Sequence, residues 1–110
     1  MSEHDQCAAT LDRLFRALGH QSRRRILVFL VREGVADEGI ELERLAAEVA
    51  EMNVATEDFY HVHLPRLDEV EFVDWDQEHQ TIRRGPRFDE VTPLLELLDE
   101  HRDELPTGWP

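Results

Sequence analysis

Lysine is absent from this chain of 110 residues, in which all twelve basic residues are arginine. The 25 aspartate and glutamate residues outnumber the arginines and give a formal net charge of −13 at pH 7. Dense carboxylates without lysine are typical of proteins that stay hydrated and dissolved in concentrated salt. We therefore predict that the chain comes from a halophilic organism with a salty cytoplasm.

Cysteine is nearly absent as well, because Cys7 is the only one. A single cysteine excludes an intrachain disulfide and fits a reducing compartment. No apolar run approaches the roughly 18–20 residues that a membrane-spanning helix needs. The first residues, MSEHDQC, lack the basic and apolar regions of a signal peptide. We expect one cytoplasmic domain without membrane contact.

Signatures of catalysis and of metal binding are missing too. The chain contains no glycine-rich phosphate loop, and its carboxylates are too numerous for any pair to be informative. His61 and His63 are two residues apart, so on a helix they point about 200° away from each other. Zinc-binding pairs on a helix are instead spaced by four residues. We expect no enzyme activity, no cofactor and no metal site.

The acidity does not by itself exclude nucleic acid as a partner. In dilute buffer a net charge of −13 would disfavour DNA, whose binding depends largely on neutralising phosphates. At molar salt the screening length falls to about 3 Å. Affinity for DNA then depends on local contacts, so the distribution of the arginines matters more than the total charge.

Helical spacing of apolar residues dominates the first 70 positions. Gly19 ends the first helix, Ser22 can cap the second, and Thr56 can cap the fourth. Ile40 can form a short strand before the third helix. We expect helices over 8–18, 23–33, 41–51 and 56–70.

The spacing of apolar residues changes from helical to alternating after the fourth helix. Val73 and Trp75 alternate with Asp74 and Asp76, which predicts a β-hairpin with a polar tip over 72–84.

A last helix follows the hairpin and is expected to begin near residue 88 or 92. Thr92 can cap it and Pro93 suits its first position.

The predicted order is α-α-β-α-α-β-β-α, a mainly α fold with a small β-hairpin. A connector of four to five residues joins the third and fourth helices, as a helix-turn-helix requires. The hairpin stands where a wing would be. We therefore expect a winged helix-turn-helix domain over 8–87, a C-terminal helix over 88–105, and flexible tails at 1–7 and 106–110.

Three segments resemble ArsR-type winged helix-turn-helix regulators. LFRALGHQSRRRILVFLVREG, 14–34, resembles the second-helix signature of that family, with Arg23 at the position of its arginine and Ile26 and Leu27 at its apolar pair. LERLAAEVA, 42–50, is similar to its third helix. HVHLPRLDEVEFV, 61–73, is similar to its recognition helix and exit.

The resemblance covers about 14–84 and includes the hairpin. His63 and Leu64 fall on the histidine-leucine pair of the family. The following proline, with a wing that begins Val-Asp-Trp-Asp, resembles the small winged-helix domains that are abundant in haloarchaea. Glu71 departs from the pattern, because the family has a glycine there and a non-glycine in a left-handed turn costs about 1 kcal/mol. The cysteine pairs of the metal-sensing members are absent.

The resemblance implies that recognition helix 56–70 and wing 72–84 contact DNA. On the helix, the outward residues early in the segment include no arginine, asparagine or glutamine, the side chains that read bases best. Clusters of arginine at the start of the second helix and at the end of the wing are placed to contact phosphates. The predicted DNA contacts are Arg23, Arg24, Thr56, His61, Val62, His63, Arg66, Arg83, Arg84 and Arg87.

Each of these assignments has a structural alternative. The arginine clusters can pair with the abundant carboxylates instead of phosphates. His63 can be a partly buried, hydrogen-bonded side chain at the edge of the core, and His61 can be plainly exposed to solvent. Pro65 removes a helical hydrogen bond to the carbonyl of His61, so the helix bends there or a separate turn precedes it.

The resemblance also implies dimerisation through the first and last helices. The predicted interface consists of Leu11, Leu14, Phe15, Val91, Leu94, Leu95 and Leu98. Alternatively, these two apolar stripes pack within one chain. The favoured function is a homodimeric regulator of transcription that binds double-stranded DNA. The alternative is a winged-helix module that contacts other regulatory proteins.

Overall fold

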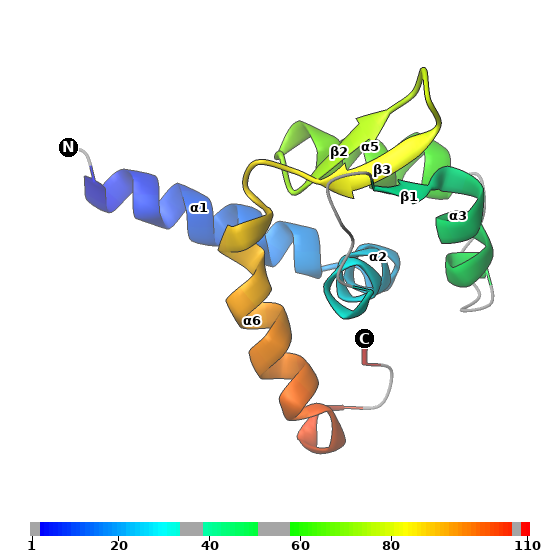
Figure 1. Ribbon diagram of the computed structural model, residues 1–110. Coiled ribbons are helices and arrows are strands. Elements are labelled where there is room, and N and C mark those ends of the chain that lie inside the picture. The colour runs from blue at the N-terminus through cyan, green and yellow to red at the C-terminus, as the bar shows by residue number, and fades with distance from the viewer. Residues whose placement is uncertain (1–2, 34–38, 51–57, 107–108) are drawn as a thin grey trace.

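The computed structural model describes residues 3–33, 39–50, 58–106 and 109–110 (Figure 1). The fold is mainly helical with a small antiparallel sheet, as expected. No helix in these ranges is long and apolar enough to cross a membrane. The helical elements are α1 (Glu3–Leu18), α2 (Gln21–Arg32), α3 (Leu42–Ala50), the π-helical turn η1 (Phe59–His63), α5 (Leu64–Glu69), α6 (Phe88–Glu100) and the 3-10 turn η2 (Arg102–Glu104).

The sheet contains three strands, β1 (Ile40–Glu41), β2 (Val73–Asp76) and β3 (Thr81–Arg84). The predicted hairpin is confirmed, with Trp75 opposite Ile82 in the antiparallel pair β2–β3. The short strand at Ile40 is also confirmed, and it pairs with β3 at Ile82. The spatial order β1-β3-β2 therefore makes β3 the central strand and anchors the hairpin to the segment that enters α3.

The first two helices both begin earlier than expected. Helix α1 begins at Glu3, five residues before the predicted start, so residues that were assigned to a flexible tail are helical. Helix α2 begins at Gln21 and is capped by His20, whose Nδ1 accepts the backbone N–H of Ser22 at 3.1 Å. Ser22 is therefore not the cap.

The predicted fourth helix is divided by a change of hydrogen-bonding pattern. The N–H of Leu64 donates to the carbonyl of Phe59, five residues back, which defines the π-helical turn before α5. Pro65 follows directly, at the second position of α5, and has no N–H to donate. The irregularity expected at Pro65 thus takes the form of one wide turn. Thr56, the predicted cap, lies outside the described residues.

The exit from α5 uses the left-handed conformation at a residue other than glycine. Glu71 has φ 67°, and the N–H of Phe72 donates to the carbonyl of Leu67 at 3.0 Å. A Cβ at Gly85 would overlap the carbonyl oxygen of Glu71. That carbonyl also accepts the N–H of Arg87 at 2.9 Å. The turn into the hairpin and the chain leaving it are therefore held against each other.

Helix α6 starts at Phe88 rather than at Thr92. The hydroxyl of Thr92 donates to the carbonyl of Phe88 at 3.1 Å, so it lies within the helix and does not cap it. Pro93 is also inside the helix. Beyond η2, the Nε1 of Trp109 donates to Asp99 at 3.2 Å and its ring packs on the core. Part of the predicted C-terminal tail thus returns to the body of the protein.

The core surrounds α2, which lies at the centre of Figure 1. Five consecutive residues of α2, 26–30, are buried, so neighbouring elements cover this helix on every side. The other fully or almost fully buried large side chains come from α3, η1, α5, the turn before β2, the sheet and α6. They are Leu45, Phe59, Leu64, Leu67, Phe72, Ile82, Phe88 and Leu95.

Candidate nucleic-acid interface

The predicted recognition segment exposes few hydrogen-bond donors. His61 and Arg66 are exposed and Val62 is half-buried, as a contact surface on this segment requires. No carboxylate of the described chain lies within 4 Å of the Arg66 guanidinium. His63, by contrast, is only 2% exposed. Our prediction that His63 contacts DNA is therefore wrong, and the ring lies deeper than the partly buried position of its alternative.

His63 packs against two basic side chains. Its Nδ1 lies 3.3 Å from Nη1 of Arg23, and its ring centroid lies 4.3 Å from that of His20. Burial is the main cause that lowers the pKa of His63 to about 4, and the charges of His20 and Arg23 lower it further. The ring is thus neutral near pH 7 and holds η1 against the start of α2.

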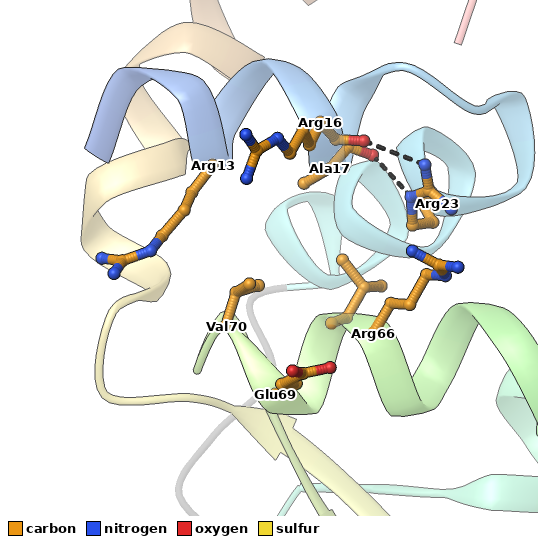
Figure 2. Close-up of a pocket in the computed structure, with 8 residues that line it drawn as sticks. Arg13, Arg16, Ala17, Arg23, Arg66, Glu69 and Val70 are labelled. Carbon is orange, nitrogen blue, oxygen red and sulfur yellow. Dashed lines mark hydrogen bonds between the residues drawn. The ribbon is translucent and has the colours of Figure 1, made fainter. Parts of the chain in front are cut away.

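The arginines at the start of α2 bind the end of α1. Arg23 donates from Nε to the carbonyl of Ala17 at 3.1 Å and from Nη2 to the carbonyl of Arg16 at 2.9 Å (Figure 2). Arg24 donates from Nη1 to the carbonyl of Leu18 at 2.7 Å. These carbonyls belong to the last turn of α1, where the helix leaves most carbonyls without a backbone donor, although the carbonyl of Arg16 also accepts the N–H of Gly19 at 3.3 Å. Neither phosphates nor carboxylates are needed to explain the two side chains.

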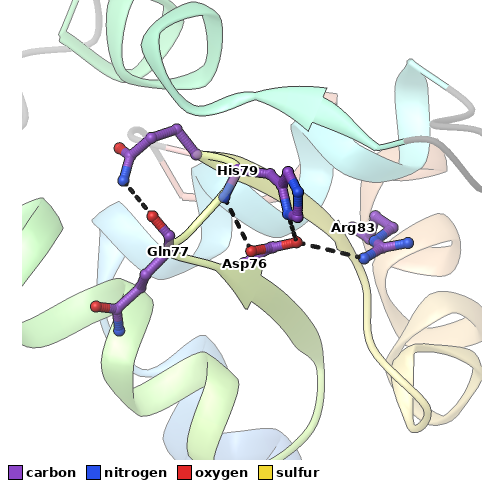
Figure 3. A network of polar contacts seen from close by, with 5 residues as sticks. Asp76, Gln77, His79 and Arg83 are labelled. Atoms are coloured by element: carbon purple, nitrogen blue, oxygen red, sulfur yellow. Dashed lines mark hydrogen bonds and ion pairs between the residues drawn. The ribbon is translucent and has the colours of Figure 1, made fainter.

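The β2–β3 hairpin, the predicted wing, carries a polar network at its tip (Figure 3). Asp76 accepts the backbone N–H of His79 at 3.0 Å, and its other oxygen lies 2.8 Å from Nδ1 of the same histidine. The backbone hydrogen bond is the main cause that lowers the pKa of Asp76. The Arg83 guanidinium lies 3.8 Å from the Asp76 carboxylate. His79 is exposed at this tip, where no sequence motif points to it as a contact.

The remaining wing arginines also have partners within the chain. Arg84 donates to the carbonyl of Leu30 at 2.9 Å, and its guanidinium lies 5.0 Å from the centre of the Phe88 ring. Arg87 lies 3.6 Å from the Glu71 carboxylate. The alternative of pairing with carboxylates thus applies to Arg83 and Arg87, while Arg84 ties the wing to α2 and α6.

The predicted dimer residues separate into three groups by exposure. Leu14, Val91 and Leu95 are buried in the core of their own chain, so the prediction that they form an intersubunit contact is wrong. Leu94 and Leu98 are half-buried. Leu11 is 50% and Phe15 is 59% exposed on α1. Leu97, which the predicted interface omits, is 52% exposed on α6.

The residues around these surfaces offer no set of metal ligands. Among the described residues, no three histidine, cysteine, aspartate or glutamate side chains are grouped so that they could hold an ion.

Comparison with known proteins gives one match. A family model described as Domain of unknown function (DUF7344) matches residues 15–83. This stretch begins near the end of α1 and runs into β3, so it contains the recognition segment and nearly the whole hairpin and leaves out α6. No curated protein and no solved structure matches the chain.

Proposed function

We propose that this chain, which belongs to the family described as Domain of unknown function (DUF7344), is a winged helix-turn-helix regulator of transcription. It would bind double-stranded promoter DNA as a homodimer in the cytoplasm of a halophilic archaeon. The order α2, α3, η1–α5 and hairpin supports this proposal, because it is the order that the ArsR resemblance implies. The pairing of β1 with β3 supports it as well, since it fixes the hairpin beside the helices.

The observation that carries the proposal is the tight connection between the recognition segment and the wing. The N–H of Phe72 donates to the carbonyl of Leu67, and the N–H of Gly85 donates to the carbonyl of Phe72, both at 3.0 Å. The end of α5, the start of β2 and the end of β3 therefore form one hydrogen-bonded unit. When two elements must contact one DNA duplex together, the protein binds more tightly if both are already held in position, because less conformational freedom is lost on binding.

The exposed groups suggest how each element would contribute. On the recognition segment, His61 can hydrogen-bond a base edge or phosphate, Val62 can contact a thymine methyl group, and Arg66 can bind guanine or phosphate. At the wing, His79 and Arg83 would lie against the phosphate backbone. Arg24 and Arg84 would position these elements rather than touch DNA, whereas Arg23 stays a predicted contact. Thr56 stays a predicted contact outside the described residues.

The exposed apolar side chains of the terminal helices support the homodimer. Leu11, Phe15 and Leu97 are large and at least half exposed, although scattered apolar groups alone do not require a partner. A two-fold axis beside α1 and α6 would bury them and would present two recognition segments to successive major grooves.

Chromatin immunoprecipitation in the native host tests the proposal. We expect discrete promoter peaks that share a motif with two-fold symmetry. The double variant His61→Ala, Arg66→Ala should lose these peaks, while Arg102→Ala, an exposed arginine on η2, should keep them. A tagged protein that is stably expressed but gives no enriched sites would contradict the proposal.

A winged-helix module for protein contact is the second candidate. The donor-poor outer face of the recognition segment favours it, since only His61 and Arg66 project polar nitrogen atoms there. In that case, precipitation from the host would recover a regulatory protein whose capture is lost in His61→Ala, without promoter peaks.

A further inference from the structure

A cavity of about 340 Å³ lies between α1, the start of α2 and α5 (Figure 2). Four arginines line it, namely Arg13 and Arg16 from α1, Arg23 from α2 and Arg66 from α5. Glu69 is the one acidic residue in the lining, and apolar side chains complete it. One third of the twelve arginines in a chain of net charge −13 thus surround a single hollow.

The four arginines at the cavity have no acidic partner in the part of the chain that the structure describes. Among the described residues, no carboxylate lies within 4 Å of the guanidinium groups at the cavity, although Glu69 is part of the same wall. Four arginines outside the cavity each have an acidic partner. They are Arg32 with Asp99, Arg44 with Glu33, Arg83 with Asp76 and Arg87 with Glu71. Carboxylates are therefore plentiful on this protein but do not neutralise the cavity.

The gathered charges repel one another. Burial is the main cause that lowers the pKa of Arg23, and the charge of Arg66 lowers it further. Figure 2 shows the Arg66 guanidinium directed toward Arg23. An anion between the two groups would replace this repulsion with attraction.

We propose that the cavity binds a small multivalent oxyanion of the phosphate class. Guanidinium groups present forked pairs of N–H donors that match phosphate oxygens, and such charge-assisted bonds are stronger than neutral ones. The volume lies at the lower end of the range for ligand pockets, roughly 300–1,000 Å³, which suits a compact ligand. Several guanidinium groups acting together favour a multivalent anion over the chloride of a salty cytoplasm.

The phosphate can come from a free molecule or from the backbone of nucleic acid. The proposal goes beyond DNA binding, because a free phosphate compound would occupy the cavity even if the protein bound no DNA. Arg23 also contacts His63, a residue of the predicted recognition segment, at 3.3 Å. An anion that binds Arg23 would therefore act on a side chain that helps to hold this segment in place.

Titration with pyrophosphate tests the site in the full chain. ¹⁵N-labelled protein at constant molar KCl and neutral pH would be followed through the arginine Nε–H resonances, with affinity measured by calorimetry. We expect saturable shifts at Arg13, Arg23 and Arg66. Arg66→Gln should weaken binding by about tenfold or more, because it removes charge-assisted hydrogen bonds.

Two further variants separate specific binding from damage or screening. Glu69→Gln removes the acidic group in the wall and should tighten pyrophosphate binding, an effect that loss of folding cannot produce. Arg102→Gln removes an equally charged, exposed side chain outside the cavity and should change nothing. Shifts that do not saturate, or equal weakening in Arg66→Gln and Arg102→Gln, would overturn the proposal.

A competition arm identifies the source of the phosphate. A fluorescent DNA duplex of random sequence is added to the protein, and pyrophosphate is then titrated. If pyrophosphate displaces the duplex and Arg66→Gln weakens both, the cavity binds a backbone phosphate. If pyrophosphate binds without displacing the duplex, the ligand is a free phosphate compound. The same conclusion holds if pyrophosphate binds and the duplex does not bind at all. Both outcomes support the site.

Discussion

Nη1 of Arg23 and Nδ1 of His63 lie 3.3 Å apart and connect the start of α2 to the π-helical turn. Because an arginine side chain only donates hydrogen bonds, Nδ1 of His63 accepts, and the ring proton is on Nε2. Nε2 is buried and has no hydrogen-bond partner among the described residues. Protonation of His63 would thus add a buried cation directly beside Arg23.

The stability of the protein should therefore fall in mild acid. The pKa of His63 is about 4 in the folded protein and about 6.5 in an unfolded chain. The folded state binds the proton less well, so the contribution is complete above pH 6.5 and decreases as the pH falls toward 4. Its full size is up to about 3 kcal/mol. Thermal unfolding at constant KCl between pH 7.5 and 5 measures the part of this loss, about 2 kcal/mol, that falls above pH 5.

Two variants assign this pH dependence to one side chain. His63→Leu should flatten the profile between pH 7.5 and 5. His61→Gln, which changes an exposed histidine of the same turn, should leave the slope intact. An unchanged slope in His63→Leu would refute the assignment.

Gly85 should tolerate no side chain. Gly85→Ala would push a methyl group into the carbonyl of Glu71, which is backbone and cannot rotate away. We expect a loss of about 1–3 kcal/mol in the free energy of unfolding, as for other overpacked sites. Gly19→Ala is the matched control, because its nearest atom, the carbonyl oxygen of Phe15, lies 3.2 Å from the added Cβ. Chemical denaturation should show a clearly smaller loss for Gly19→Ala, and equal losses would contradict the prediction.

Glu71→Gly should stabilise the protein. Glycine removes the penalty of φ 67°, about 1–2 kcal/mol, and costs part of that gain through greater freedom of the unfolded chain. We expect a net gain of about 0.5–1 kcal/mol in the free energy of unfolding. Glu69→Gly, in the helix two residues earlier, should instead lose about 1 kcal/mol. Denaturant titration of both variants checks that the free energy of unfolding changes in opposite directions. A lower free energy of unfolding in Glu71→Gly would contradict the prediction that this turn is strained.

The oligomeric state tests the exposed face of α1. Light scattering at high salt should give twice the chain mass of 12.9 kDa. Phe15→Glu should yield the monomer, since it places a charge where an apolar contact is proposed. Gln77→Glu adds the same charge at the wing tip and should remain dimeric. A monomer in the unchanged protein would exclude the homodimer.

Sequence periodicity predicted the helices and the hairpin because those signals are local. Leu64 and Leu67 recur at helical spacing, and Val73 and Trp75 alternate, whatever the rest of the chain does. The pairing of Ile40 with Ile82 was not predictable from such patterns, since the two residues are distant in sequence and meet only through the fold.

The roles of individual side chains were less predictable for the same reason. His63 was identified as a candidate, but its burial against Arg23 depends on a contact across forty positions. The carbonyls that Arg23 and Arg24 bind become acceptors only once α1 ends beside α2. DNA binding and dimerisation stay predictions, because they concern surfaces whose partners are separate molecules.

The π-helical turn has a consequence for chain length. The bond from Leu64 to Phe59 spans one residue more than an α-helical bond. Deletion of one residue within this turn would let an ordinary α-helical turn form, with Phe59 and Leu64 still facing the core on either side. The turn is thus a place where homologous chains can differ in length by a single residue without disturbing the alignment of the core, although such a deletion would rotate His61 on the outer face.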